Sequence, residues 1–240
     1  MRLSKKDIKK LGTILGVWAH PDDETFSSAC IMAAAIENGE TVACITATRG
    51  EAGVRDESRW PAERLGDIRS QELATALELL GVSNHHWLDY PDGCCCEIDE
   101  PSPVGRIVEL IETYNPDTIL TFGPDGMTGH DDHKTVSRWA NLAVQGAGTK
   151  AKVYHAVQTT EQYDELLEAD KHFNIFFNID KPPLVDQVKC DIYFEPTKEL
   201  LEKKLAALRS MPSQSEDLVK KFGDRFVEGK LGAEAFVRSV

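Results

Sequence analysis

The chain has 240 residues, of which 41% are hydrophobic and 28% charged, and its 27 basic and 40 acidic side chains give a formal net charge of −13. This composition differs from that of disordered proteins, and a chain of this length buries roughly 70% of the surface that it exposes when unfolded. The acidic balance argues against a general nucleic-acid binder, which needs a basic surface.

The sequence offers neither a typical export signal nor a membrane span. The basic residues near the start are not followed by the apolar segment of a signal peptide, and no run of about 18 apolar residues occurs. We therefore expect a cytoplasmic protein. Six cysteines are too sparse for a disulfide framework. Cys94, Cys95 and Cys96 are consecutive and are interpreted as a reduced loop, with a redox or accessory metal role as the alternative.

Short apolar runs alternate with helical patterns along the first 157 residues. The predicted strands cover residues 13–19, 41–47, 85–88, 117–122 and 152–157. The predicted helices cover residues 26–38, 61–80, 104–114 and 130–145. Gly39 and Gly81 are suited to end the first two helices, and Pro116 blocks continuation of the third. This alternation predicts an α/β fold, a Rossmann-like doubly wound and mostly parallel sheet with helices on both faces.

The remainder of the chain is less regular. Between residues 158 and 195 we expect additional strands or a lid, with a break at Pro182-Pro183. Residues 197–209 are predicted to be helical, with Thr197 as the cap, and the tail from Ser213 to be helical in pieces. No repeat or low-complexity linker divides the sequence. We therefore predict one domain over residues 1–240, in which residues 1–157 carry the site and residues 158–240 form a less regular part.

Two clusters of metal-binding residue types follow two of the predicted strands. They consist of His20, Asp22, Asp23 and Glu24 in the first and His130, Asp131, Asp132 and His133 in the second. Either cluster alone could be structural, because acidic residues also stabilise the start of a helix. Ligands gather at the carboxyl ends of the strands in an open parallel sheet, so both clusters are expected at one edge. Together they predict a site.

The residue types in these clusters suit a divalent metal. Two imidazoles and one carboxylate can hold Zn²⁺ and leave a position for water, although the same ligands also suit Fe²⁺. A spare carboxylate beside a ligand can act as a general base for that water. By contrast, His85 and His86 end a weakly apolar strand, and we expect them to be solvated rather than metal ligands.

The chain resembles the LmbE-like (PIG-L-type) metal-dependent N-deacetylases in segments that occur in the family's order. These segments are AHPDDE at 19–24, TRGEAG at 48–53, NPD at 115–117 with TFGPDG at 121–126, and GHDDH at 129–133. The resemblance implies that His20, Asp23 and His133 are zinc ligands. It also implies that Asp22 is the general base.

The resemblance implies further roles around the metal. His130 would be a charged imidazole that stabilises the oxyanion, and Asp132 would orient it. Arg49 and Arg69 match positions that face substrate. Two positions depart from the family pattern: Asp131 stands where the family usually has proline, and Met211 stands where members often carry histidine.

The function implied by the resemblance is removal of an acetyl group from an N-acetylglucosamine-type or similar small amide. A metal-activated water would attack the amide, and the small molecule would be the partner that the site recognises. Family members are often oligomeric, so a homo-oligomer is possible. Two alternatives remain open: an amidase of thiol conjugates that uses the same site, and a metal-binding module that does not turn over.

Overall fold

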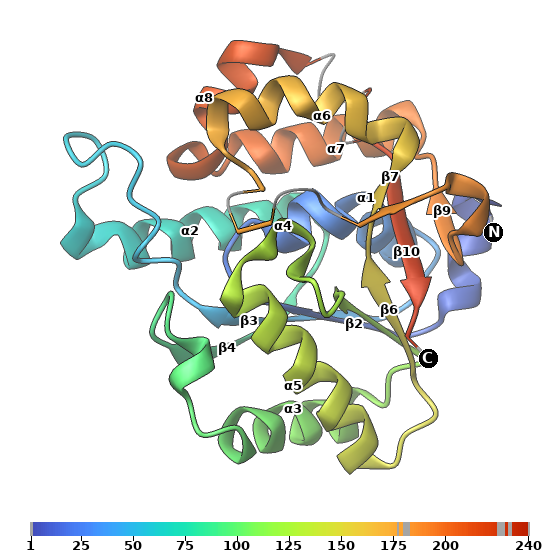
Figure 1. The fold of residues 1–240 in the computed structure, drawn as a ribbon. Coiled ribbons are helices and arrows are strands. Elements are labelled where there is room, and N and C mark those ends of the chain that lie inside the picture. The colour runs from blue at the N-terminus through green and yellow to red at the C-terminus, as the bar shows by residue number, and fades with distance from the viewer. Residues whose placement is uncertain (1, 177, 180–182, 225–228, 230–231, 240) are drawn as a thin grey trace.

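The computed structural model describes residues 2–176, 178–179, 183–224, 229 and 232–239. Its main sheet contains β1 (Arg2–Leu3), β2 (Ile14–Trp18), β3 (Val42–Thr48), β4 (Asn84–Tyr90), β5 (Thr118–Phe122), β6 (Lys152–Ala156), β9 (Ile192–Phe194) and β10 (Glu234–Arg238). The strand order is β1-β9-β10-β6-β5-β2-β3-β4 (Figure 1). A separate short pair is formed by β7 (Gln158–Thr159) and β8 (Leu184–Val185).

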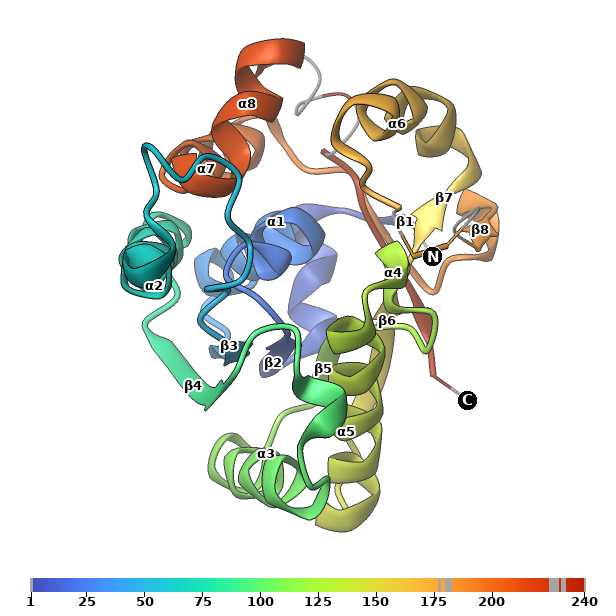
Figure 2. The same ribbon diagram turned by 60° about the vertical axis from the view of Figure 1, so that its left-hand side comes forward.

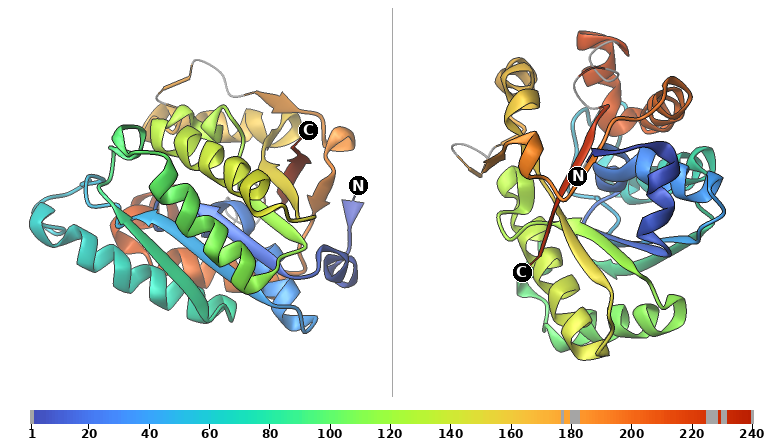
Figure 3. Two further views of the ribbon diagram at one scale, coloured as in Figure 1. Left: turned by 90° about the horizontal axis from the view of Figure 1, so that it is seen from below. Right: turned by 90° about the vertical axis from the view of Figure 1, so that its right-hand side faces the viewer.

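Helices cover both faces of the main sheet. They are α1 (Asp23–Glu37), α2 (Ala62–Leu80), α3 (Pro101–Tyr114), α4 (Gly126–Gly129), α5 (Asp131–Ala147), α6 (Thr160–Phe173), α7 (Lys198–Arg209) and α8 (Pro212–Phe222). α3 packs against α5 on one face, whereas α1, α2 and α7 pack together on the other (Figures 1 and 3). The predicted α/β class, with a mostly parallel sheet between helices, is confirmed.

The order of the strands creates a switch point at the centre of the sheet. β2 pairs in parallel with both β3 and β5, β3 pairs with β4, and β5 pairs with β6. The chain therefore runs outward from β2 through β3 to β4, and then returns to build the other half from β5. Loops that leave two strands in opposite directions open a crevice beyond the carboxyl ends, where α/β proteins bind ligands.

Burial explains why the central strands could be predicted. Every residue of β2, β3 and β5 is buried, as expected for strands that have helices on both sides. The hydrophobic core also draws on distant parts of the chain, among them Leu3, Trp18, Phe122, Leu208 and Phe236.

The strands β7, β8 and β9 confirm the expected additional strands between residues 158 and 195, and α8 confirms a helical piece in the tail, but two elements differ from expectation. Residues 160–173 form helix α6, in a stretch expected to hold strands or a lid. Its buried Leu166 and Ala169 lie three residues apart, a helical spacing. Residues 234–238 form strand β10, where helical pieces were expected. β10 lies antiparallel between β6 and β9, so it covers edges that would otherwise remain unpaired.

Smaller differences concern boundaries. α1 begins at Asp23 rather than at Phe26, and a short helix, α4, occupies part of the expected loop before His130. Pro182, at the expected break, lies outside the described residues. Among the described helices, none has the length and apolar character needed to cross a membrane.

Candidate metal and substrate site

Both predicted clusters lie at the switch point of the sheet. The first follows β2, where Asp22 is the N-cap of α1 and Asp23 its first residue. The second follows β5 and α4, where His130 is the N-cap of α5 and His133 lies in its first turn. The sequence therefore places two helix N-termini, each with a partial positive charge, at one edge of the sheet. Figure 2 shows the starts of α1 and α5 on either side of this edge.

Three buried side chains form a compact triangle of ligand atoms. His20 Nδ1 lies 3.1 Å from His133 Nε2, His133 Nε2 lies 3.3 Å from Asp23 Oδ1, and His20 Nδ1 lies 3.5 Å from Asp23 Oδ2. Ligands about 2.0–2.1 Å from a tetrahedral zinc ion are themselves about 3.3 Å apart. The spacing and the donor types therefore fit a zinc-sized ion.

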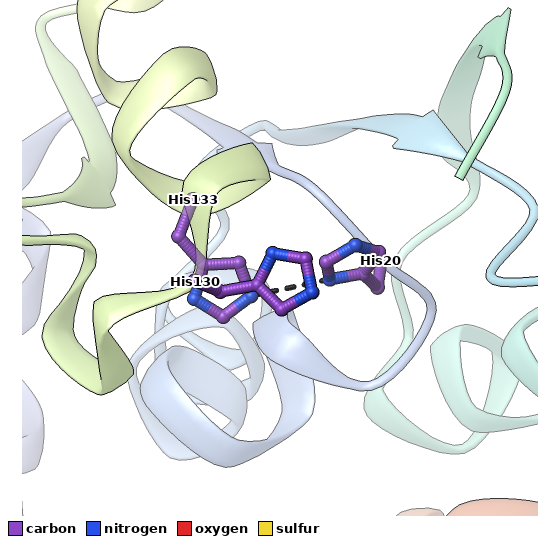
Figure 4. A group of neighbouring side chains, drawn as sticks. All are labelled: His20, His130 and His133. Carbon is purple, nitrogen blue, oxygen red and sulfur yellow. Dashed lines mark hydrogen bonds between the residues drawn. The ribbon is translucent and has the colours of Figure 1, made fainter. Parts of the chain in front are cut away.

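His130 lies beside this triangle. Ring nitrogens of His20, His130 and His133 lie within 4.8 Å of one another, and Figure 4 shows the three rings side by side. Backbone N–H of Asp132 donates to His130 Nδ1 at 3.1 Å. Because Nδ1 accepts this bond, the neutral ring carries its proton on Nε2. Burial lowers the pKa of His130, which favours that neutral form over the charged imidazole expected from the resemblance.

The far side of the His20 ring is held by two carboxylates. His20 Nε2 lies 2.9 Å from Asp92 Oδ1 and 3.2 Å from Asp132 Oδ2. Asp132 is completely buried and accepts backbone N–H bonds from Gly93 at 2.8 Å and Cys95 at 3.0 Å. A carboxylate that accepts from a ligating histidine fixes the tautomer and orientation of the ring. The Asp132 carboxylate contacts His20, and its backbone N–H donates to His130; that Asp132 orients His130 stays a prediction.

Sequence reasoning missed Asp92. Its side chain is only 5% exposed, and its Oδ2 accepts from the backbone N–H of Ala52 at 2.9 Å. This bond ties the loop after β4 to the loop after β3. Asp92 is a carboxylate just beyond a predicted strand, the same signal that marked the other clusters. It stood alone, without a neighbouring histidine, and the strand before it was weak.

Asp22 has a strained backbone and a buried carboxyl group. Its φ of 126° and ψ of −28° lie in a region that residues other than glycine rarely adopt. Burial raises the pKa of Asp22 to about 6, against the opposing charge of Arg69. Such a pKa suits a group that takes up and releases a proton near neutral pH. Burial also lowers the pKa of His133 to about 4, so His133 is neutral, as a metal ligand must be.

Arg69 fixes the position of Asp22. Its Nη2 donates to the carbonyl of Pro21 at 2.6 Å and lies 3.2 Å from Asp22 Oδ2, while Nη1 donates to the carbonyl of Gly50 at 2.8 Å. Gly50 has a φ of +69°, and a Cβ there would come within 2.3 Å of the guanidinium. The glycine in this loop is therefore required by the close approach of Arg69.

Arg49, the other arginine expected to face substrate, is held elsewhere. It pairs with Asp89 at 2.7 Å, donates to the Ser70 hydroxyl at 3.0 Å and lies 4.1 Å from the centre of the Trp87 ring. The cavity beside the site is lined by Arg55 and Arg69 instead. That Arg49 faces substrate stays a prediction.

This cavity has a volume of about 610 Å³, within the range of small-molecule sites. His20, Asp22, Asp23, His130 and His133 all line it, so the two sequence clusters meet in one cavity. Further lining comes from α6, α8 and β10, which belong to the part of the chain after residue 157.

The end of the chain is tied to the site through polar contacts. The Glu72 carboxylate accepts the backbone N–H of Ser213 at 3.0 Å and also its hydroxyl. Gln214 Nε2 donates to the carbonyl of Gly53 at 3.2 Å. These contacts hold the start of α8 against α2 and against the loop after β3, so they shape one wall of the cavity.

The departures from the family pattern lie away from the triangle. The Asp131 side chain is 67% exposed and pairs with Lys134 at 3.0 Å. Met211 is buried in the hydrophobic core and is not among the residues that line the cavity. In the consecutive cysteines, Cys95 is buried and Cys96 exposed, and all three are free thiols. Burial raises the pKa of the Cys95 thiol.

The fold and site define an α/β protein with a metal-type His-Asp centre at the switch point of its sheet. A family model described as "PIG-L: GlcNAc-PI de-N-acetylase" matches residues 15–144, more than half of the chain. The chain belongs to this family, which confirms the resemblance seen in the sequence.

Relatives of known function support the same family. A 1D-myo-inositol 2-acetamido-2-deoxy-alpha-D-glucopyranoside deacetylase from Kineococcus radiotolerans is 32% identical over 195 residues, which cover 64% of this chain and 54% of that protein. A mycothiol S-conjugate amidase from Streptomyces coelicolor is 28% identical over 158 residues, 58% of this chain and 54% of the amidase. The chain therefore spans about half the length of each of these relatives.

Solved structures share the fold. N,N'-diacetylchitobiose deacetylase from Pyrococcus horikoshii superposes with a TM-score of 0.67 at 21% identity, covering 97% of this chain and 85% of that one. GalB, a 4-carboxy-2-hydroxymuconate hydratase from Pseudomonas putida, superposes with a TM-score of 0.66 at 16% identity, covering 95% and 96%. At these identities the likeness concerns the fold alone, and the two neighbours catalyse different reactions.

Proposed function

We propose that this chain is a metal-dependent hydrolase that removes the acetyl group from an N-acetylglucosamine-type small molecule. The observation that carries the proposal is the triangle of His20, Asp23 and His133, with the carboxyl group of Asp22 next to it in sequence and in the same cavity. We propose Zn²⁺ as the metal, with Fe²⁺ as the alternative, because residue type does not distinguish them.

The metal, its ligands and the residues around them would have separate roles. When bound, a divalent cation supplies Lewis acidity, which lowers the pKa of water and polarises a carbonyl group. His20, Asp23 and His133 would hold the ion. Asp92 and Asp132 would keep the His20 ring oriented with Nδ1 toward the triangle, because both contact Nε2.

Asp22 would move the protons in the reaction. Its carboxylate accepts a proton from the attacking water while the water oxygen bonds to the acyl carbon. When the carbon–nitrogen bond breaks, Asp22 returns this proton to the departing amine, so the products are acetate and the free amino sugar. A pKa of about 6, raised by burial, permits both transfers near neutral pH.

His130 would stabilise the negative charge that develops on the acyl oxygen. Its Nδ1 accepts from the backbone, so a neutral ring presents Nε2–H as a hydrogen-bond donor. Preorganised donors of this kind are typically worth about 10²–10³ in turnover. Arg69, which holds Asp22 and Pro21, would keep the base in place.

The test is amine release from a panel of amides by protein loaded with Zn²⁺ or Fe²⁺. The panel contains N-acetylglucosaminides and thiol conjugates of the kind that the Streptomyces coelicolor relative is named for. Release from the glucosaminides supports the proposal, and release from thiol conjugates alone would favour the amidase. Stoichiometric metal without turnover of any compound would favour a binding module.

A further inference from the structure

The cavity has an apolar end that the proposed reaction leaves unused. We define this apolar end by the lining residues Val157, Leu166, Phe173, Ile175, Phe176 and Leu218. They belong to α6, α8 and adjoining segments, outside the part that matches the family model. α6 and α8 contact each other and lie above α1 and α4 in both views (Figures 1 and 2). The apolar end is thus an addition of this chain's later part to the site.

Two polar side chains beside this end, Gln162 and Glu234, already bond to other protein groups. Gln162 Oε1 accepts from the Thr159 hydroxyl at 2.8 Å, and its Nε2 donates to the Ala233 carbonyl at 3.0 Å. The Glu234 carboxylate lies 2.9 Å from Lys204 Nζ and accepts backbone N–H bonds from α1. The polar groups of these two side chains are therefore already engaged by the protein.

The positive charge of the described lining comes from two arginines. Among the described residues that line the cavity, the cationic side chains are Arg55 and Arg69. Arg69 is bonded to the carbonyls of Pro21 and Gly50. The six described residues that define the apolar end therefore include no lysine or arginine for a phosphate, and their carbon surface suits neither a polyol nor a charged group, since both lose hydrogen bonds to water there.

We propose that the apolar end binds an apolar aglycone, an alkyl or aryl group linked to the N-acetylglucosamine unit. This inference rests on the proposed function, because it assumes that the acetamido group lies at the triangle. A cavity of about 610 Å³ can hold a drug-sized ligand. Such a ligand is larger than a single acetamido sugar ring. The chain would then differ from its Kineococcus radiotolerans relative, whose name gives a myo-inositol aglycone.

A series of α-linked N-acetylglucosaminides tests the proposal by kcat/KM. Each buried methylene raises kcat/KM by about fourfold, so the butyl glycoside should have a kcat/KM at least tenfold above that of the methyl glycoside. The myo-inositol glycoside should have a lower kcat/KM than the butyl glycoside. Equal kcat/KM for methyl and butyl, or preference for myo-inositol, would overturn the proposal. Preference for a longer N-acyl group without any aglycone preference would overturn it too.

A pair of α6 variants assigns the effect to the apolar end. Phe173→Ser removes a half-buried ring from the lining, whereas Lys171→Ser changes an exposed residue of the same helix. Phe173→Ser should reduce the butyl-to-methyl ratio of kcat/KM by about fivefold or more, and Lys171→Ser should leave it unchanged. The ratio is insensitive to a loss of folded protein, because both substrates lose turnover equally. An unchanged ratio in Phe173→Ser would contradict the assignment.

Binding to the metal-free protein separates this inference from the proposed function. The probes are methyl and butyl 2-amino-2-deoxyglucosides, measured by titration calorimetry. Butyl should bind at least tenfold more tightly, and Phe173→Ser should reduce this difference by about fivefold or more. This result without turnover of any glycoside would reject the deacetylase and keep the apolar end. Equal affinities would reject the apolar end, whatever the turnover.

Discussion

Lys204 and Glu234 form an ion pair at 2.9 Å in which both side chains are completely buried. The pair joins three elements, because Lys204 Nζ also donates to the Phe26 carbonyl at 2.8 Å, and the Glu234 carboxylate accepts N–H bonds from Cys30 and Ile31, each at 2.8 Å. Both sets of bonds act on α1, about one and two turns after Asp23. The pair thereby links α7 and β10 to the helix that begins at Asp23.

Lys204→Met should destabilise the protein strongly. It leaves the Glu234 carboxylate buried without its cation, and breaking a buried pair in this way costs about 3–5 kcal/mol. Lys203→Met is the matched control, because Lys203 lies next in the same helix but forms a partly exposed pair with Glu37, worth about 1 kcal/mol or less. Urea unfolding measures both. Similar losses in the two variants would show that the buried pair does not stabilise the fold.

Metal binding and turnover should respond differently to two changes. His133→Ala removes a ligand of the triangle and should abolish stoichiometric zinc, measured by elemental analysis. Asp22→Asn keeps the ligands but removes the proton acceptor, so it should keep zinc and lower kcat by about 10²–10⁴. Asp131→Asn, an exposed neighbour of the second cluster, should retain both. Zinc retained in His133→Ala would refute that ligand, and normal turnover in Asp22→Asn would refute the base.

Asp92→Asn tests a residue that the sequence did not indicate. Its carboxylate contacts His20 Nε2 at 2.9 Å, and loss of such an outer partner typically weakens metal binding by about 10–100-fold. A competition titration with a zinc chelator measures the affinity. Asp99→Asn, an exposed residue in the same loop, should change nothing. Unaltered zinc affinity in Asp92→Asn would mean that Asp132 alone orients the ring.

Arg69→Lys should slow turnover without loss of metal. Lysine keeps the charge, but its single ammonium group cannot bond at once to the two carbonyls and the carboxylate that the planar guanidinium contacts. The Asp22 carboxyl group would therefore lose its fixed position. We expect kcat to fall by about 10–100-fold, since small displacements of catalytic groups cost this much. The control is Arg64→Lys, at an exposed position of α2. A rise in KM alone would point to substrate binding by Arg69, the role expected from sequence.

His85 should make folding stability depend on pH. Burial lowers its pKa to about 4, with smaller contributions from the charges of His86 and Arg49. The unfolded state binds the proton first, near pH 6.5, so stability is lost as the pH falls from about 6.5 toward 4. The loss of unfolding free energy approaches about 1.36 kcal/mol per pH unit, on the order of 1–3 kcal/mol in total.

His85→Gln removes this titration while it can keep the hydrogen bond to Thr46, which His85 Nε2 makes at 2.9 Å. Urea unfolding at several pH values should therefore show that, below pH 6.5, the wild type loses free energy of unfolding and the variant loses less. Parallel pH profiles would contradict this. His85, which was expected to be solvated, is half-buried and bonded to Thr46 of β3.

The sequence by itself determined the α/β class and the two clusters of the proposed metal site. Both follow from local signals: buried parallel strands appear as short apolar runs, and His20, Asp23 and His133 are ligand types placed at strand ends. Neither signal requires knowledge of distant contacts.

Only the tertiary structure decided which groups act together. Asp92 reaches His20 across 72 positions, Asp132 turns its carboxylate to that same ring, and Lys204 meets Glu234 inside the core. β10 becomes a strand because it fills the space between β6 and β9. Such partners are chosen by packing and by the need to pair buried charges, and these conditions exist only once the chain has folded.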